Sequence, residues 1–400
     1  MSSLLRDVAD YSDSRISLDE INVETYVTTD NLLQNKQGKV SAVKMPKQAS
    51  NTVTRFDKGD VLVANIRPYL KKIWLAKYSG GSSTDVLTFK VKEGFDATFV
   101  YYALFRDDFF EHMMNGSKGT KMPRGDKNQI LDFTIPDFDI CNQKQIAKVL
   151  SDLDDKIELN NKINTELEAM AKLIYDYWFV QFDFPDNNGN PFKSSGGKMV
   201  FNAELNREIP EGWEVKRFDQ ILSQITDSIE PHEYPQLQYL PIDKLPTKKL
   251  YYQDYDSRDE ANSSLIRFQE NDILLGAMRV YFHRVCNAIE DGISRSTMMV
   301  LRPIVSMHKN FALFTLNRNE AIEYATKNST GTSIPYAKWS YNLESYKFSM
   351  PSNEELITEF NETVDPIIEN FKTLSKENQK LVELRDWLLP MLMNGQVRVK

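Results

Sequence analysis

The chain has 400 residues, of which 41% are hydrophobic, and its formal net charge is −8. A single core stops growing at roughly 250 to 300 residues, so this length favours at least two folded parts. No apolar run approaches the roughly 20 residues that a membrane helix needs, and the N-terminal residues lack the basic and apolar segments of a secretory signal. Two distant cysteines and four scattered histidines offer no metal-ligand spacing. We therefore expect a protein of the reduced cytoplasm that holds no metal and contacts no membrane.

The negative charge is unevenly distributed along the chain. Residues 55–127 hold 13 Lys or Arg against 9 Asp or Glu, whereas residues 142–180 hold 5 against 7 and residues 351–386 hold 4 against 9. The two acidic segments are those in which long helices are predicted below. Because a basic stretch lies in the first half, the overall charge does not exclude a nucleic-acid partner.

The first region, residues 1–140, has a mixed pattern. Short β-branched and apolar runs at 60–67, 72–78 and 86–91 are separated by Gly and Ser and predict strands. Residues 97–115 have apolar side chains at helical spacing. The region is therefore predicted to be an α+β module.

A stretch without Gly or Pro from Asn142 to Gln181 predicts one long helix, assigned to 141–181. Positions spaced alternately by four and three residues form a coiled-coil seam. These positions are Ile146, Leu150, Leu153, Ile157, Asn160, Asn164, Leu167, Ala171, Ile174 and Trp178. The interior Asn residues are typical of a device that fixes helix register, although a frayed, solvated turn would also contain them.

Residues 182–208 are rich in Pro, Gly, Asn and Ser and predict a linker, after which residues 209–351 repeat the first region. An offset of 212 residues places Asp60 on Asp272 and Arg67 on Arg279, and it places "GTKMP" (119–123) on "GTSIP" (331–335). The offset grows by three where 134–138 meets 349–353. Chance similarity of two β-rich segments is the alternative, but the order of elements also agrees. We therefore predict a duplicated domain.

The last segment, 352–400, predicts a second long helix with its own seam. The seam positions are Ile357, Phe360, Val364, Ile367, Phe371, Leu374, Asn378, Leu381, Arg385 and Leu388. An interior Pro removes a helical hydrogen bond, so we expect a kink or a fresh helix start at Pro366. Antiparallel packing of the two helices would give the molecule a pseudo-two-fold axis.

Three segments together resemble the specificity (S) subunits of type I restriction-modification systems. They are "QKQIAKVLSDLDDKIELNNKINTELEAMAKLIYDYWFVQFDF" (143–184), "IPEGWEVKRFDQI" (209–221) and "ENQKLVELRDWLLPMLMNGQV" (377–397). With the repeat, the similarity covers nearly the whole chain. The first module departs from the pattern, because it starts at "MSSLLRDV" without the lead-in of Ile209 to Trp213.

The resemblance implies a fold and a set of partners. The fold is α+β, with two duplicated target-recognition domains separated by two long antiparallel helices. Each domain would read one half of a bipartite target in double-stranded DNA, and the helices would set the spacer. Two adenine-methylating modification (M) subunits would dock on this chain, and restriction (R) subunits would join them. The chain itself would hold no cofactor. S-adenosylmethionine would lie on the M subunits, and ATP and Mg on the R subunits.

Candidate DNA-binding residues are the polar and cationic side chains of the repeated motifs and loops, because readout needs donors at base edges and cations at phosphates. In the first module they are Arg67, Lys71, Lys72, Ser82, Ser83, Thr84, Lys118, Thr120, Lys121, Arg124 and Lys127. In the second they are Arg279, Arg284, Ser294, Arg295, Thr332, Ser333, Tyr336 and Lys338. The shared pair Arg67 and Arg279 could equally be structural.

Candidate partner-binding residues lie near the helix ends, where the surface is more apolar than a two-helix seam requires. They are Tyr175, Trp178 and Phe179 in the first helix and Trp387, Leu388, Pro390 and Met391 in the second. The alternative is that they pack on the chain's own modules.

No catalytic residue is predicted. The chain contains neither the Asn/Asp-Pro-Pro-aromatic motif of amino-methyltransferases nor a phosphate-binding G-x-x-x-x-G-K-[ST]. The leading hypothesis is therefore a non-enzymatic DNA-recognition subunit. The alternatives are a self-sufficient DNA-modifying enzyme with an unrecognised active site, and a coiled-coil scaffold that binds only proteins.

Overall fold

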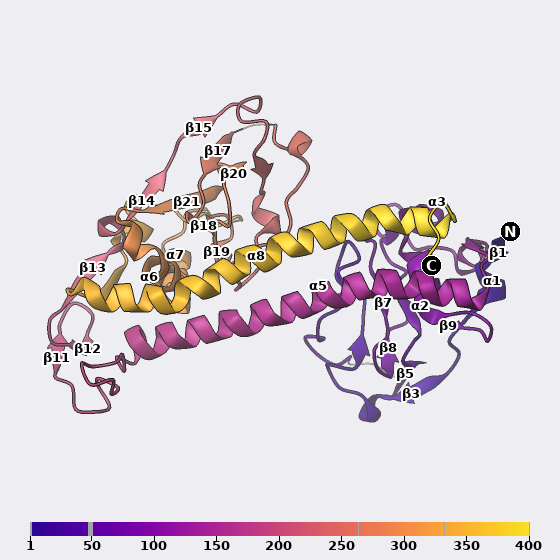
Figure 1. Ribbon diagram of the computed structural model, residues 1–400, viewed down its shortest axis with the longest axis horizontal. Coiled ribbons are helices and arrows are strands. Elements are labelled where there is room, and N and C mark those ends of the chain that lie inside the picture. Colours follow the sequence, from indigo (N-terminus) through magenta and orange to yellow (C-terminus); the bar gives the residue numbers. More distant parts are fainter. Residues whose placement is uncertain (1, 47–50, 263, 332, 400) are drawn as a thin grey trace. The chain divides into compact units, whose positions relative to one another are not determined.

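The computed structural model describes residues 2–46, 51–262, 264–331 and 333–399. The chain divides into two compact units, residues 1–156 with 381–400, and residues 157–380 (Figure 1). Each unit contains one α+β module and parts of both long helices. The predicted α+β class is confirmed.

The first module contains two four-stranded sheets and a short strand pair. The first sheet has the order β2-β9-β6-β7, with β2 at Ala9–Tyr11, β9 at Val86–Val91, β6 at Val61–Ala64 and β7 at Ile73–Leu75. The second has the order β3-β5-β8-β4, with β3 at Arg15–Ser17, β5 at Thr52–Phe56, β8 at Gly80–Ser82 and β4 at Tyr26–Val27. Strand β1 (Ser2–Leu4) pairs with β10 (Thr134–Pro136) and joins the two ends of the module.

Strand β6 explains how the first module packs. Its residues Val61 and Val63 lie in a core with helices α2 (Ala97–Phe105) and α3 (Asp107–Asn115). Its residues Leu62 and Ala64 lie in a separate core with side chains of the second sheet. Successive side chains of a strand point to opposite faces, so an apolar run without alternation is what burial on both faces requires.

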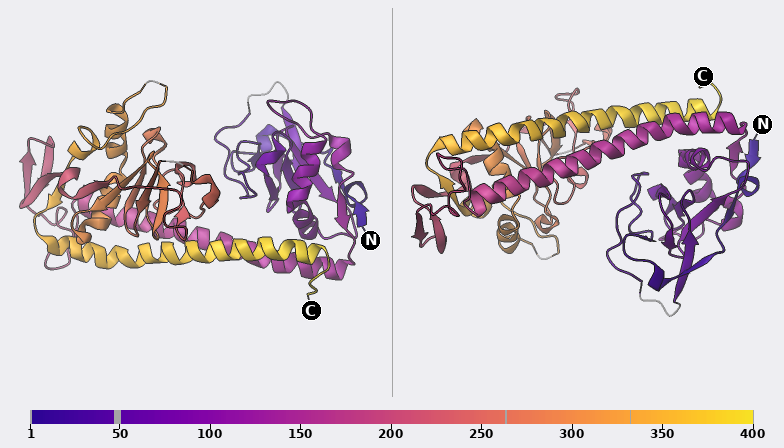
Figure 2. Two further views of the ribbon diagram at one scale, coloured as in Figure 1. Left: turned by 90° about the horizontal axis from the view of Figure 1, so that it is seen from above. Right: turned by 60° about the horizontal axis from the view of Figure 1, so that its bottom comes forward.

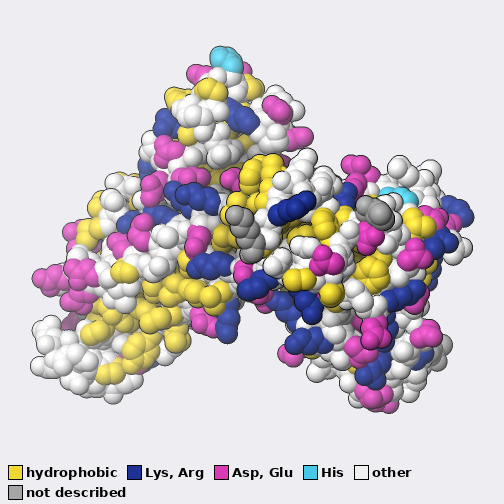
Figure 3. Space-filling view, turned by 45° about the vertical axis from the view of Figure 1, so that its right-hand side comes forward, with side chains coloured by type: hydrophobic (Ala, Val, Ile, Leu, Met, Phe, Trp, Pro, Cys, Tyr) yellow, Lys and Arg dark blue, Asp and Glu magenta, His cyan; other side chains and the backbone are white. Residues whose placement is uncertain are grey.

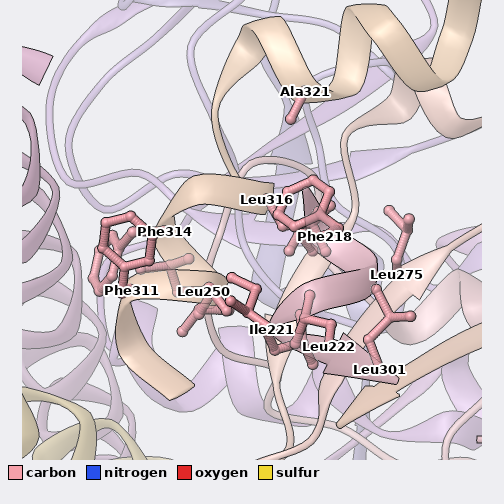
Figure 4. Close-up of a cluster of buried hydrophobic side chains, with 14 of the residues drawn as sticks. Phe218, Ile221, Leu222, Leu250, Leu275, Leu301, Phe311, Phe314, Leu316 and Ala321 are labelled. Atoms are coloured by element: carbon pink, nitrogen blue, oxygen red, sulfur yellow. The ribbon is translucent and has the colours of Figure 1, made fainter. Parts of the chain in front are cut away.

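The second module has the same topology. One sheet has the order β14-β21-β18-β19, with β14 at Leu222–Ile225, β21 at Met298–Pro303, β18 at Ile273–Gly276 and β19 at Val285–Asn287. The other has the order β15-β17-β20-β16, with β15 at Ser228–Ile229, β17 at Leu265–Phe268, β20 at Gly292–Arg295 and β16 at Gln238–Tyr239. Strand β13 (Trp213–Arg217) pairs with β22 (Lys347–Pro351), and helices α6 (Lys309–Leu316) and α7 (Asn319–Lys327) complete the core (Figure 4). The predicted duplication is confirmed strand by strand.

The two long helices each contribute one end to each core. Helix α5 spans Ile140–Tyr175 and continues as a π-helical turn over Asp176–Val180, and helix α8 spans Glu354–Met393. Within the first unit, Ile146 and Leu150 of α5 join the core together with Leu389 and Leu392 of α8. Within the second, the core contains side chains from the other ends: Ala171, Tyr175, Phe179, Ile357, Phe360 and Val364.

The helices run antiparallel within each unit. In the second unit the Asn160 side chain donates to Asn378 Oδ1 at 2.9 Å, while Trp178 and Phe360 contact each other with ring centroids 5.9 Å apart. In the first unit Arg385 donates to Asp154 at 2.7 Å. Asn160 and Asn164 are fully buried, so they lie in the seam as predicted, and the alternative of a solvated turn is wrong.

Two expectations about the helices and linker need correction. Helix α8 continues without a break through Pro366, so the expected fresh helix start is wrong; a kink there stays a prediction. Pro366 is exposed, where water can satisfy the carbonyl group that lacks an N–H partner. The segment predicted as a linker, residues 182–208, contains β11 (Met199–Asn202) and the start of β12 (Arg207–Pro210). These two strands form a hairpin that stands apart from the four-stranded sheets of its module (Figure 2). Phe184 stacks on Phe192 and Trp213 and anchors this segment.

Candidate nucleic-acid interface

A turn with an unusual backbone recurs in both modules. In the first, Arg67 and Lys71 flank the short helix η2 (Pro68–Leu70), and both adopt the left-handed conformation, with φ of 52° and 49°. In the second, Arg279 and His283 flank η7 (Val280–Phe282) with φ of 52° and 55°. Left-handed backbone is costly for residues other than Gly, and it concentrates at functional sites. Its recurrence at four matched positions makes this turn a candidate part of the site.

A loop is tied to each turn. In the first module the Arg67 N–H donates to Pro123 O at 2.8 Å, and Lys118 and Arg124 exchange two backbone hydrogen bonds that close the loop. In the second module the Arg279 N–H donates to Pro335 O at 2.7 Å, and Thr330 and Tyr336 close the matching loop. The turn and the loop therefore form one surface feature in each module, which we call the turn-loop site.

The serines predicted to read bases are not available for contact. Ser82 and Ser294 are fully buried, and their hydroxyl groups contact Thr88 Oγ1 and Leu240 O. The prediction is wrong for both, because β8 and β20 lie inside their modules. Ser83 is half-buried and Thr84 is exposed, so these two stay candidates.

Several cations that were predicted to bind DNA instead form hydrogen bonds or ion pairs within their own module. Lys72 donates to Thr29 O and Arg284 donates to Ile242 O, so both act within their modules. Burial is the largest influence on Lys72 and lowers its pKa. Lys71 lies 3.0 Å from the Asp107 carboxylate, and Arg295 donates to Tyr239 Oη at 2.9 Å. These side chains position loops, and a DNA contact by Lys72 or Arg284 would require loss of the bond to a carbonyl.

Cations of the first turn-loop site are mostly exposed. Lys118 pairs with Asp126 at 3.2 Å, Arg124 pairs with Asp85 at 2.9 Å, and the Lys127 ammonium lies 5.8 Å from the centre of the Tyr11 ring. Surface pairs of this kind contribute roughly 0 to 1 kcal/mol, so a phosphate can replace the carboxylate. Lys121 is exposed and makes no ion pair with any described residue, and Thr120 is exposed beside it.

The second turn-loop site has fewer cations. Arg279 and Lys338 are exposed and make no ion pair within the described part of the chain. Ser333 is exposed, and Tyr336 is half-buried with its hydroxyl 3.4 Å from Ser296 O. Thr332 lies outside the described residues. Figure 3 shows acidic and basic side chains interspersed on the face that it draws.

The sequence reading missed four residues of these sites. Tyr69 is 50% exposed and Tyr281 49%, and Met122 is 51% exposed and Ile334 49%. They are two pairs at the same 212-residue offset. The repeat contained the signal, since Tyr69 and Tyr281 match in it, but alignment does not say which matched residues are exposed.

A surface pocket lies beside the turn of the second module. Its volume is about 300 Å³, and it is lined by Lys248, Tyr281, His283, Asn319, Ile322, Glu323, Thr326 and Lys327. His283 is buried, its Nε2 lies 2.8 Å from Asn317 O, and burial lowers its pKa. At neutral pH its ring is therefore uncharged and packs as part of the pocket wall.

The predicted partner-binding residues divide into two groups. Tyr175 and Phe179 are buried, and Tyr175 stacks on Phe314 and shares a hydrogen bond with Thr315. Trp178 is partly buried against the same core. The docking prediction is wrong for Tyr175 and Phe179, because for them the alternative of packing on the chain's own module holds, whereas Trp178 is partly exposed and stays a prediction. In α8, Trp387 is 56% exposed and Pro390 is exposed, whereas Leu388 and Met391 are partly covered, so these four stay a prediction.

No helix among the described residues combines the length and apolarity that crossing a bilayer requires. Within the same residues, no group of three His, Cys, Asp or Glu side chains is placed to hold a metal ion.

Comparisons with known proteins agree with this architecture. Residues 5–169 match the family model for the type I restriction modification DNA specificity domain. The chain is 27% identical to the type I restriction enzyme MjaIX specificity subunit of Methanocaldococcus jannaschii, over 86% of this chain and 79% of that protein. It is 23% identical to the HindI specificity subunit of Haemophilus influenzae, over 93% of this chain and 94% of that protein. The crystal structure of a type I restriction-modification S subunit from M. genitalium has a similar fold, with a TM-score of 0.58 and 14% identity over 98% of this chain and 95% of that one.

Proposed function

The chain belongs to the specificity subunits of type I restriction-modification systems, which recognise DNA sequences, and from this premise we propose that each module reads one half of a bipartite double-stranded target. The observation that supports this division most strongly is the matched topology of two modules whose loop side chains differ. Two modules with the same backbone topology and different loop side chains are suited to recognise two half-targets of different sequence. Within each reader, the turn-loop site supplies exposed cations for phosphates and exposed hydroxyl groups for base edges.

A module exchange tests the division of labour. Residues 2–136, which β1 and β10 close, would be replaced by the matching module of another specificity subunit, with α5 and α8 kept. The chain would then be co-expressed with its methylating subunits, and methylated adenines would be mapped by sequencing. A change in one half of the methylated motif is expected. A change in both halves would contradict the assignment.

We propose that α5 and α8 set the spacer between the half-targets. Because the Asn160 side chain donates to both Glu377 and Asn378, an insertion in one helix alone would break their register. The test therefore inserts about one helical turn, roughly four residues, after Asn160 and a matching turn after Glu377. Both half-targets should persist with a longer spacer, whereas new half-targets would argue against this role.

We propose that the catalytic steps belong to partners. Two M subunits would contribute S-adenosylmethionine and methyl transfer, and R subunits would contribute ATP, Mg and cleavage. Exposed apolar side chains on the helices support docking: Trp387 and Leu384 on α8, and Leu159, Met170 and Leu173 on α5. Trp387→Ala should weaken co-purification with M subunits while leaving the chain folded. Methyl transfer by the purified chain alone would contradict the proposal and favour a self-sufficient enzyme.

A further inference from the structure

The turn-loop site presents an apolar pair in each module. Tyr69 and Met122 are each about half exposed, as are Tyr281 and Ile334. Single exposed apolar side chains are ordinary on protein surfaces. These four differ, because they occupy matched positions in two modules whose loop cations differ.

The backbone brings the members of each pair to the same place. Ile66 and Arg124 form an antiparallel bridge, and the Arg67 N–H donates to Pro123 O. This bond ties η2, which carries Tyr69, to the loop directly after Met122. In the second module, the Arg279 N–H donates to Pro335 O and ties η7, which carries Tyr281, to the loop directly after Ile334.

Each tyrosine lies on a short helix that packs against its own module. The left-handed residues on both sides of η2 and η7 fix the direction of the turn, and the turn packs against α3 in one module and α7 in the other. Tyr281 also contacts the Phe282 ring, with centroids 4.9 Å apart. A strained backbone held by packing is a typical support for a side chain that must keep one direction.

The surrounding charge favours a polyanion as the occupant. Lys121 and Arg124 lie next to the first pair, and Arg279 and Lys338 lie in the segments that carry the second. Proteins that insert wedges between DNA base pairs use apolar side chains, Met and Ile among them, together with Arg and Lys.

We propose that Tyr69 with Met122, and Tyr281 with Ile334, act as apolar wedges that enter between adjacent base pairs of each DNA half-target. The contact unstacks one base step in each half without reading its sequence. This inference rests on the proposed DNA recognition and adds a second mode of contact to it. The cations hold the phosphates on either side, and the tyrosine ring replaces the lost stacking.

The test uses the assembled complex of the full chain with its methylating subunits. The probe is a duplex that contains the complex's own methylated motif, with 2-aminopurine placed in one half-target at a time. Wild type, Tyr69→Ala, Tyr69→Phe, Tyr281→Ala and Tyr281→Phe are compared. Phe201→Ala is the matched control, since Phe201 is 62% exposed but lies in the β11–β12 hairpin.

Each alanine variant should weaken binding by roughly 5- to 150-fold, the range that corresponds to loss of one stacked base. Tyr69→Ala should also abolish the rise in 2-aminopurine fluorescence in only one half-target, and Tyr281→Ala in the other. The phenylalanine variants should retain binding, and the mapped methylation motif should be unchanged. Phe201→Ala should bind like wild type.

Three outcomes would contradict the proposal that these side chains act as wedges. The first is wild-type affinity and fluorescence in both alanine variants. The second is an equal loss in the phenylalanine variants, which would mean that the hydroxyl group reads a base. The third is a loss that follows weaker assembly with the methylating subunits, which would assign the tyrosines to a protein contact. If the wild-type complex itself does not prefer its motif over a scrambled duplex, the proposed function fails instead.

Discussion

In the first module Lys36 and Lys71 lie 2.6 and 3.0 Å from the carboxylate of Asp107, whereas the matching positions of the second module are Lys248, His283 and Asn319. The ionic cluster is replaced by a buried imidazole whose Nε2 contacts the Asn317 carbonyl. Nevertheless, the backbone at these positions has the same conformation and hydrogen bonds in both modules. Lys36 and Lys248 have φ of 63° and 58°, and their N–H groups donate to the carbonyls of Lys71 and His283.

This difference teaches that backbone hydrogen bonds and core packing determine the turn, while the side chains around it can change. The helices give a second contrast. The first unit joins them through Arg385, which pairs with Asp154, while Tyr102 donates to the same carboxylate at 2.6 Å. The second unit joins them through an aromatic cluster around Phe360 and an amide pair. Variants at matched places therefore test whether the units are equivalent in stability as well as in topology.

The largest effect is expected in the aromatic cluster of the second unit. The Phe360 ring lies 4.9 Å from that of Phe179 and 5.9 Å from those of Trp178 and Phe314. Phe360→Ala should lower the free energy of unfolding by about 4 kcal/mol, through lost burial and the cavity left behind. Urea denaturation measures the loss, and hydrogen exchange should localise it to residues 157–380. Phe201→Ala is the exposed control, and a loss similar to that of the control would contradict the packing.

Breaking the ion pair between the helices of the first unit should cause a smaller but still substantial loss of stability. Arg385 contacts the Asp154 carboxylate at 2.7 Å, and its side chain is only 12% exposed. Arg385→Leu leaves Asp154 and the Tyr102 hydroxyl without their cation, so a loss of about 3 kcal/mol is expected. Lys148→Leu removes an exposed helical pair with Asp152 and should cost about 0.5 kcal/mol or less. Equal losses from these two variants would mean that the Arg385 pair is effectively solvated.

The sequence predicted the helix seam and the duplicated topology correctly, but it did not predict the surroundings of every candidate site residue. Apolar spacing predicted the seam, and Ile357, Phe360 and Asn378 are indeed buried. The repeat predicted the duplicated topology, because an offset held over many positions constrains strand order. Spacing cannot tell whether a surplus apolar face meets the chain's own module or a partner, so Tyr175 was assigned wrongly. Ser82 was assigned wrongly because a Gly/Ser run was taken as a turn, although it forms a buried strand.

A smaller contrast lies at the start of β6 and β18. Asp60 and Asp272 each accept a hydrogen bond from the backbone N–H of the residue three positions earlier. Only Asp272 also has a bidentate partner, Arg302, which donates to it at 2.7 and 2.8 Å. Burial raises the pKa of Asp60, so its folded environment disfavours the charged form. Asp272→Asn should therefore cost about 2 kcal/mol and Asp60→Asn less than about 1 kcal/mol. Thermal denaturation of the two variants measures the difference, and the reverse order would show that the two carboxylates do not play these roles.

The smallest effect concerns pH and should occur only in the second unit, since Lys71 occupies the matching position in the first. Burial is the main cause that lowers the pKa of His283, and the nearby Lys172 and Lys248 lower it further, while the hydrogen bond to Asn317 opposes them. The folded state thus binds the proton less readily than the unfolded chain. As pH falls through the ordinary His value of about 6.5, the unfolded chain gains more protons and the unit loses stability.

His283→Gln removes this contribution and keeps a polar side chain in the pocket wall. The fall in Tm from about pH 7.5 to about pH 5.5 should therefore be smaller in the variant than in wild type. His308, whose pKa burial also lowers, remains in both proteins and supplies the residual slope. Lys71→Gln, at the matching position of the first turn, is the control and should leave the slope unchanged. If Tm depends on pH equally in wild type and His283→Gln, protonation of His283 does not affect the stability of the second turn.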